Sequence, residues 1–306
     1  MTDQVLPHVI VLAGGEGRRL ASLTRTLYGV DLPKQFAVLA GAQSLLQATV
    51  ERATTLTTLD RISVVVSAHH EPIARGQLAP YSGVELVVQP RNLDTGPGML
   101  LPLVRILARS WDARVVFMPS DHHMSNAEPI RQGLQSATSD VLRDRLALVG
   151  VAPTGPEIDY GWIVRGNRLG QTGAFEIRRF CEKPSHAIAG ELWRAGALWN
   201  TFISTGPGRV FWDLARRHMP NQAAAFERYS LAVGHRAADA LDAIYQFMAP
   251  ANFSRDVLAH AQSLAVLPVD GSGWSDWGSP SRVFASLTGT ESHTRLVERI
   301  GGELTC

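Results

Sequence analysis

A glycine-rich segment near the start of this 306-residue chain has the residue types of a phosphate-binding loop. Residues 14–20 read Gly-Gly-Glu-Gly-Arg-Arg-Leu and follow an apolar run at 8–13 that predicts a buried β-strand. Glycines let the backbone approach a ligand and direct its N–H groups at phosphate oxygens, and arginines add charge-assisted donors. The segment matches neither the dinucleotide fingerprint nor the P-loop, so a purely structural turn is the alternative interpretation.

Two further charged residues stand where phosphate chemistry could use them. Lys34 follows Pro33, which stiffens the backbone, although Lys34 taken alone is better explained as a surface lysine. Asp121 follows an apolar run at 114–118, and open parallel sheets bind ligands at the carboxyl ends of their strands. A carboxylate there can hold Mg²⁺ against phosphate oxygens. The adjacent His122 and His123 point in different directions on an extended chain, so we expect capping or solvent contacts rather than a zinc site.

Strands that alternate with helices must position these residues. Apolar runs rich in β-branched residues predict strands at 8–13, 62–67, 84–88, 114–118 and 146–151, with helices expected at 44–54, 72–78, 98–110 and 130–142. Such alternation indicates βαβ units and a mostly parallel sheet. After residue 151 the alternation fades into expected strands at 157–165, 175–182, 198–204 and 263–269, with a helical segment at 209–260. We expect one compact α/β unit with a helical insertion, because no Gly/Ser- or Pro-rich linker interrupts it.

The composition excludes several classes of protein. The chain is 45% hydrophobic and 19% charged, and its 29 basic and 28 acidic residues leave a net charge of +1, which argues against binding nucleic acid or an acidic membrane. Its two cysteines, Cys181 and Cys306, cannot form a disulfide framework or a four-cysteine zinc site. The start has no basic n-region, and no apolar run reaches about 18 residues. We therefore expect a soluble cytoplasmic protein.

The glycine-rich segment together with Pro33-Lys34-Gln35-Phe36 resembles the opening signature of the sugar-1-phosphate nucleotidyltransferases, and within them most of all the mannose-1-phosphate guanylyltransferases. Arg18 stands where that family usually has threonine. The resemblance implies a Rossmann-like three-layer fold with a mostly parallel mixed central sheet and a helical insertion towards the C-terminus. It also implies that Arg19, Lys34 and Asp121 are catalytic.

Five later segments resemble further motifs of the family, so the resemblance spans 12–279 in order. It implies a nucleotide site formed by Leu12, Ala13, Gly14, Gly15, Gly17, Arg18, Gln89, Arg91, Asn92, Thr95 and Pro97. It implies a sugar-phosphate site formed by Tyr160, Gly161, Glu182, Lys183 and Asn200. Asp121 and Asp276 would hold Mg²⁺, although they lie about 150 residues apart and can do so only if the fold unites them.

The resemblance predicts a nucleotidyltransferase domain at 1–290, with its helical insertion at about 209–260, and a C-terminal tail at 291–306. The expected reaction joins a nucleoside triphosphate, GTP first, to a sugar 1-phosphate, mannose 1-phosphate first, and a homodimer is the expected assembly. Phe202 replaces a glycine of the family's sugar-side motif, so the sugar stays open; in the last motif Trp277 replaces a valine. The alternatives are another sugar, UTP or dTTP, or a non-catalytic protein that binds nucleotide sugars.

Overall fold

Four parallel strands form the first half of the central sheet. The structure, a computed structural model, describes residues 6–137, 142–231 and 236–301. Strands β1 (His8–Leu12), β2 (Ile62–Ser67), β3 (Glu85–Gln89) and β4 (Arg114–Pro119) lie in the order β3-β2-β1-β4. All three pairings are parallel, and each strand is a short apolar run, as the sequence predicted.

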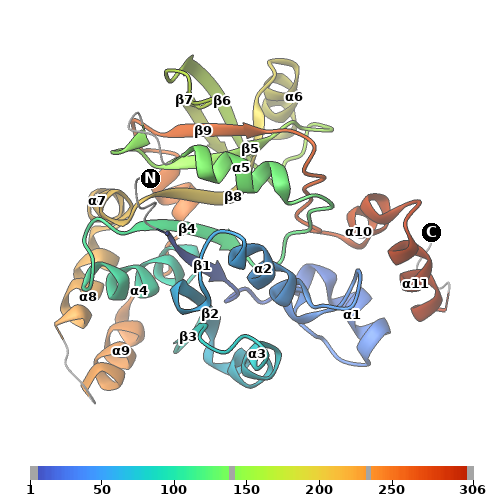
Figure 1. Cartoon of the computed structure of the whole chain (residues 1–306), viewed down its shortest axis with the longest axis horizontal. Helices are drawn as coiled ribbons and strands as arrows, with labels where there is room; N and C mark the ends of the chain where they lie inside the picture. Colours follow the sequence, from blue (N-terminus) through green and yellow to red (C-terminus); the bar gives the residue numbers. More distant parts are fainter. Residues whose placement is uncertain (1–5, 138–141, 232–235, 302–306) are drawn as a thin grey trace.

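Helices cover both faces of this parallel half, which makes three layers (Figure 1). Val9 and Val11 pack with helices α2 (Leu45–Thr54), α3 (Glu71–Leu78) and α5 (Glu128–Ser136). Ile10 faces the opposite side and packs with α4 (Thr95–Leu107). Successive side chains on a strand point to opposite faces, so one continuous apolar run supplies two cores.

The second half of the sheet is built around a long strand, β8 (Leu198–Pro207), which runs antiparallel to β4. Beyond it lie β5 (Ala147–Val151), β9 (Ala265–Val269), β7 (Phe175–Glu182) and β6 (Gly161–Arg168), in the order β8-β5-β9-β7-β6. An additional pairing of β6 with β8 closes these five strands into a barrel-like ring.

The prediction of a mostly parallel sheet is wrong. Among the described residues, four strand pairings are parallel and five are antiparallel. The hydrophobic pattern identified the strands but not their directions, because a buried strand has the same pattern in either direction. The turn from β6 to β7 contains Gly170 and Gly173 at positive φ and is too short for a parallel crossover, which needs a dozen or more residues.

The helical segment expected at about 209–260 contains α7 (Gly208–His218), α8 (Pro220–Ser230), α9 (Arg236–Phe247) and a short π-helix, Phe253–Leu258. Apolar side chains of these helices join the core beneath α4, while residues 232–235 lie outside the described part. The predicted helix at 130–142 corresponds to α5, and its residues 138–141 also lie outside that part.

Four helices were not predicted from the sequence: α1 (Ala21–Tyr28), α6 (His186–Arg194), α10 (Pro280–Leu287) and α11 (Glu291–Arg299). Helices α10 and α11 lie beside α1 (Figure 1), and Leu23, Val283 and Leu296 of these helices share one apolar cluster with Trp277. The division at residue 290 stays a prediction, and Met1 to Val5 and residues 302–306, Cys306 included, are not described. No helix in the described ranges combines the length and apolar character needed to span a bilayer.

Candidate active site

One cavity of about 460 Å³ collects most of the residues that the sequence motifs singled out. It opens at the carboxyl ends of β1, β3 and β4, where an open parallel sheet binds ligands. The predicted residues that line it are Leu12, Gly14, Gly15, Arg19, Gln89, Asn92, Thr95, Asp121, Tyr160, Gly161, Glu182, Lys183, Asn200 and Asp276. Segments from both halves of the chain thus meet around one volume.

The glycine-rich loop is held against the Pro33-Lys34-Gln35 segment. The buried Gln35 side-chain amide donates hydrogen bonds to the carbonyl oxygens of Ala13, at 3.1 Å, and of Gly15, at 2.6 Å. Gly17 has φ +61°, and a Cβ there would lie 2.5 Å from the backbone nitrogen of Lys34. The two motifs therefore pack as one unit that only glycine permits at this position. Gln35 was quoted in the motif but not predicted as a site residue.

Lys34 links the two acidic motifs. Its ammonium lies 3.0 Å from Oδ2 of Asp121 and donates a hydrogen bond to the backbone carbonyl of Asp276, while the residue is only 4% exposed. Burial acts to raise the pKa of Asp121, but the charge of Lys34, with a contribution from His122, holds that pKa below its usual value. Asp121 is therefore an anion at neutral pH.

Asp276 is buried and held by three donors. Its Oδ1 accepts hydrogen bonds from the Tyr160 hydroxyl at 2.7 Å, the Gly278 N–H at 2.9 Å and the Arg282 guanidinium at 3.2 Å. Burial opposes ionisation, yet the Tyr160 hydrogen bond and the Arg282 charge lower the pKa of Asp276 overall. Arg19 lies 3.7 Å from the other oxygen, Oδ2.

An isolated antiparallel bridge unites the two acidic segments. The backbone N–H and C=O of His123 pair with those of Ser275 at 2.9 and 3.0 Å. Asp121 and Asp276 therefore enter the same cavity although they lie far apart in sequence. The fold thus brings both acidic residues to one cavity, as a shared metal site would require.

His122 and His123 have different environments, as expected from their alternation. Nδ1 of His122 accepts a hydrogen bond from the Trp274 indole at 3.2 Å, and burial lowers the pKa of His122 to about 4, so the ring is neutral at pH 7. The His123 ring stacks on Trp277 at 4.2 Å between centroids and also has a pKa lowered to about 4 by burial. His122 lines the cavity, which the sequence had not predicted.

The predicted sugar side carries unusual backbone conformations. Lys183 and Phe202 line the cavity with φ of +45° and +63°, and Asp94, which also lines it, has φ +70°. Left-handed backbone is costly for residues with a Cβ and clusters at functional sites. A Cβ on Gly161 would lie 2.8 Å from Oε2 of Glu182, whose pKa is raised, mainly by burial.

Several predicted residues do not line the cavity. Arg18 is 84% exposed and lies near Glu16, while Ala13 and Pro97 are buried. Arg91 donates to the backbone carbonyls of Tyr245 and Gln246 at the end of α9. Gly17 and Lys34 lie behind the loop, against each other.

Sequence reasoning also missed residues that shape the site. Arg282 contacts Asp276 and lies 4.8 Å above the Tyr160 ring, but nothing in its sequence neighbourhood marked it. Trp274 was inside a recognised motif and could have been proposed from that position. Other missed lining residues are Gln35, Asp94, Ser120, Asp159 and Ser254.

The residues present fit the Mg²⁺ that the resemblance implies. Asp121 and Asp276 offer ionised carboxylate oxygens, which are the ligands that hard divalent cations prefer. Both line the cavity beside the cations Lys34 and Arg19, so the site already concentrates opposite charges.

Comparisons with known proteins agree with this geometry. Residues 8–292 match the family described as Nucleotidyl transferase. A putative mannose-1-phosphate guanylyltransferase of Vibrio cholerae is 28% identical over 281 residues, and a mannose-1-phosphate guanylyltransferase of Salmonella montevideo is 31% identical over 292. Each alignment covers 90% of this chain and 59% of the relative, so the chain spans about three fifths of those proteins.

A solved structure titled mannose-1-phosphate geranyltransferase, from Thermus thermophilus, is similar with a TM-score of 0.76 and 27% sequence identity. The similarity covers 89% of this chain and 76% of that one, and it confirms the α/β nucleotidyltransferase fold. The resemblance seen in the sequence motifs is confirmed at the level of the family. The chain belongs to the Nucleotidyl transferase family.

Proposed function

We propose that this chain transfers a nucleoside monophosphate from a nucleoside triphosphate to a sugar 1-phosphate and releases pyrophosphate. The observation that carries the proposal is the meeting of the glycine loop, two acidic segments and Lys183 around one cavity. A volume of about 460 Å³ lies within the ordinary range for small-molecule sites. The family membership supports the same class of reaction.

On the nucleotide side, the loop and its cations receive the triphosphate. Gly14 and Gly15 line the cavity and leave room for phosphate oxygens near the backbone, and Arg19 supplies a charged donor. Lys34 does not line the cavity, but from its buried position between the two acidic segments its charge offsets, at a distance, the negative charge that develops as pyrophosphate leaves. Arg91 is assigned a supporting role outside the cavity, because its guanidinium caps the end of α9.

On the sugar side, Lys183 binds the phosphate, and Glu182 accepts hydrogen bonds from sugar hydroxyls. A phosphate oxygen of the sugar 1-phosphate attacks the α-phosphorus, and the bond to the β-phosphate oxygen breaks. The attacking oxygen is already anionic, so no general base is needed. The chain's contribution is to align the two substrates and to stabilise negative charge.

Asp121 and Asp276 would hold Mg²⁺. When bound, the ion supplies electrostatic stabilisation of phosphate charge. The Tyr160 hydroxyl, Gly278 N–H and Arg282 orient the Asp276 carboxylate for this task. Tyr160 remains a donor, because burial and the neighbouring Asp276 raise its pKa far above neutrality.

GTP and mannose 1-phosphate are the first pair to test, because the relatives from Vibrio cholerae and Salmonella montevideo are named as mannose-1-phosphate guanylyltransferases. The test measures pyrophosphate release for four nucleoside triphosphates against several sugar 1-phosphates, with and without Mg²⁺. We expect pyrophosphate release to be fastest with one pair of substrates and to require Mg²⁺. No release with any pair would overturn the proposal and favour a protein that only binds nucleotide sugars.

Asp121→Asn is the matched variant for this assay. It keeps the shape of the side chain but removes its charge, so we expect most of the activity to be lost while circular dichroism shows an unchanged fold. A variant with full Mg²⁺-dependent turnover would refute the assigned role of Asp121.

A further inference from the structure

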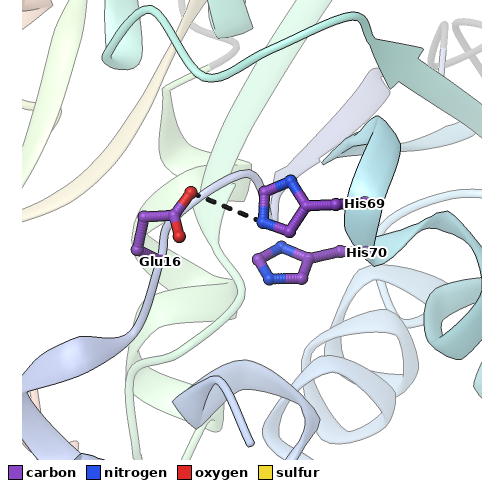
Figure 2. A group of neighbouring side chains, drawn as sticks. All are labelled: Glu16, His69 and His70. Atoms are coloured by element: carbon purple, nitrogen blue, oxygen red, sulfur yellow. Dashed lines mark ion pairs between the residues drawn. The ribbon is translucent and has the colours of Figure 1, made fainter. Parts of the chain in front are cut away.

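A second group of metal-ligating side chains lies beside the glycine loop and outside the residues that line the cavity. Figure 2 shows Glu16 facing the rings of His69 and His70. Glu16 belongs to the loop after β1, and the histidines belong to the 3-10 turn Ala68–His70 directly after β2. Because β1 and β2 are parallel neighbours, the two segments emerge side by side.

The spacing of the ligand atoms suits a small cation. One ligand atom from each of the three residues lies within 4.8 Å of the others. Nε2 of His69 is 3.5 Å from Oε1 of Glu16. Two ligands at about 2.0–2.1 Å from a tetrahedral Zn²⁺ stand about 3.4 Å apart, so this pair already has the right separation, and the ligand atom of His70 lies within 4.8 Å of both.

His70 supplies an independent indication of a ligand. The residue is 7% exposed, and its Nδ1 is buried without a hydrogen-bond partner among the described residues. Buried polar atoms are usually satisfied, so an orphan of this kind points to a missing partner. Burial and the neighbouring His69 also lower the pKa of His70, and the neutral ring is the form that binds metal.

The surroundings allow a metal to reach the group. The His69 side chain is 54% exposed and the Glu16 side chain 39%, so the buried His70 is approached through solvent-facing partners. The competing partner of Glu16 is Arg18, which lies 3.8 Å from Oε2, the carboxylate oxygen that does not face His69. This contact is exposed and therefore weak.

We propose that Glu16, His69 and His70 form a binding site for a transition-metal dication of the Zn²⁺ class, distinct from the Mg²⁺ site assigned to Asp121 and Asp276. Two imidazoles and one carboxylate favour Zn²⁺ or Co²⁺ over the oxygen-seeking Mg²⁺. Three protein ligands leave the fourth position to water. The bound ion adds a second link between the glycine loop and the end of β2, where the Ser67 hydroxyl already donates a hydrogen bond to the Gly14 carbonyl at 3.0 Å.

The test titrates the purified 306-residue chain with Zn²⁺ by calorimetry and with Co²⁺ by visible absorption, whose intensity reports tetrahedral coordination. Four proteins are compared: the unaltered chain, His69→Ala, Asp121→Asn and His186→Ala. His186 is an exposed histidine at the start of α6, so His186→Ala controls for loss of an ordinary surface imidazole. His70 is not replaced, because a change at this buried ring could disturb folding.

We expect His69→Ala to raise the dissociation constant of the tight Zn²⁺ site by at least about tenfold and to remove the visible absorption of bound Co²⁺. Asp121→Asn and His186→Ala should keep both. Zn²⁺ at about a hundredfold excess over its dissociation constant should raise the Tm of the unaltered chain by about 5 °C, and the weaker binding in His69→Ala should reduce this shift to about half or less. Retention of the Zn²⁺ equivalent in His69→Ala, or its loss in Asp121→Asn, would overturn the proposal.

Glu16→Gln gives a second, independent check. It preserves the size of the side chain but removes the anionic ligand, so we expect weaker Zn²⁺ binding with an unchanged Tm in the absence of metal. Binding as tight as in the unaltered chain would exclude Glu16 as a ligand. Neither measurement depends on turnover, so a failure of the proposed reaction leaves this test intact.

Discussion

At the scale of single residues, the site is stabilised by ion pairs between side chains of opposite charge. Lys34 is almost fully buried, and an ammonium in that position requires an anionic partner. Asp121 supplies it at 3.0 Å, and the backbone carbonyl of Asp276 accepts a hydrogen bond from the same ammonium. Because the Asp121 side chain is 33% exposed, the carboxylate stays accessible from the cavity while it neutralises the lysine.

Lys34→Met is expected to lower the free energy of unfolding by about 2 kcal/mol, because it leaves Asp121 without its cation. The partial exposure of Asp121 keeps this loss below that of a fully buried pair. Urea unfolding of Lys34→Met, Asp121→Asn and the double variant measures it. We expect the double variant to be more stable than the sum of the single losses predicts, and strict additivity would contradict the coupling.

Phe202 is the residue where the chain departs from its family and where its backbone is strained. Its φ is +63°, the region in which glycine alone is unpenalised, and its side chain packs against the larger apolar core. The left-handed backbone at this position explains why the family has glycine there. In this chain the phenylalanine side chain also adds bulk to the cavity wall.

Comparison of Phe202→Gly with Phe202→Ala separates these two effects. Both variants remove the ring, but only glycine relieves the backbone, so Phe202→Gly should be more stable than Phe202→Ala by about 1 kcal/mol in urea unfolding. Both should alter the ratio of kcat/KM among sugar 1-phosphates more than among nucleoside triphosphates. Equal stabilities, or a change confined to nucleotide preference, would contradict this explanation.

At the scale of elements, the glycine loop and the 3-10 turn Lys34–Phe36 behave as one unit. Gly17 touches the backbone of Lys34, and Gln35 holds the loop through its carbonyl oxygens. These contacts hold the loop in place, and Gly14 and Gly15 line the cavity.

Gly17→Ala is expected to destabilise the chain by more than about 1 kcal/mol, because its Cβ would meet the Lys34 nitrogen at 2.5 Å and its φ is +61°. Gly15→Ala is the matched control, since nothing lies within 4 Å of a Cβ there. Thermal unfolding should give a clearly lower Tm for Gly17→Ala and little change for Gly15→Ala. A similar Tm for both would show that the loop is not packed in this way.

At the scale of the whole molecule, two partly buried histidines couple the site to overall stability. His122 and His123 have pKa values lowered by burial from 6.5 to about 4, so between these pH values the unfolded chain binds more protons than the folded one. The free energy of unfolding must then fall as the pH is lowered from about 6.5 to about 4.

For His122, whose side chain is 15% exposed, the loss is on the order of 3 kcal/mol. Urea unfolding at several pH values, in metal-free buffer, measures it. His122→Asn has no ionisable ring at this position, so its stability should depend less steeply on pH over the same interval. An unchanged slope would show that His122 does not remain neutral in the folded chain.

The parallel half of the sheet, the glycine-rich loop and Asp121 followed from the sequence for a physical reason, whereas the other candidate site residues were implied by the family resemblance. A strand buried on both faces must be a short apolar run, and glycines and charged residues directly after such strands are typical of a ligand site. The occurrence of six motifs in order then made a chance arrangement implausible. The helices α10 and α11 were missed because their apolar face forms only against α1 and Trp277, a partner that local pattern does not reveal.

Only the tertiary structure decided the direction of the later strands and the meeting of distant residues. Nothing local to 198–207 says that β8 runs antiparallel to β4, because its apolar pattern is the same in both directions. Nothing local to Asp276 or Arg282 reveals Tyr160, and nothing local to Glu16 reveals His69 and His70. The sequence by itself determined which residue types were present and where strands ended. Folding determined which of them form ion pairs or hydrogen bonds with one another, since these energies depend on distances that only packing sets.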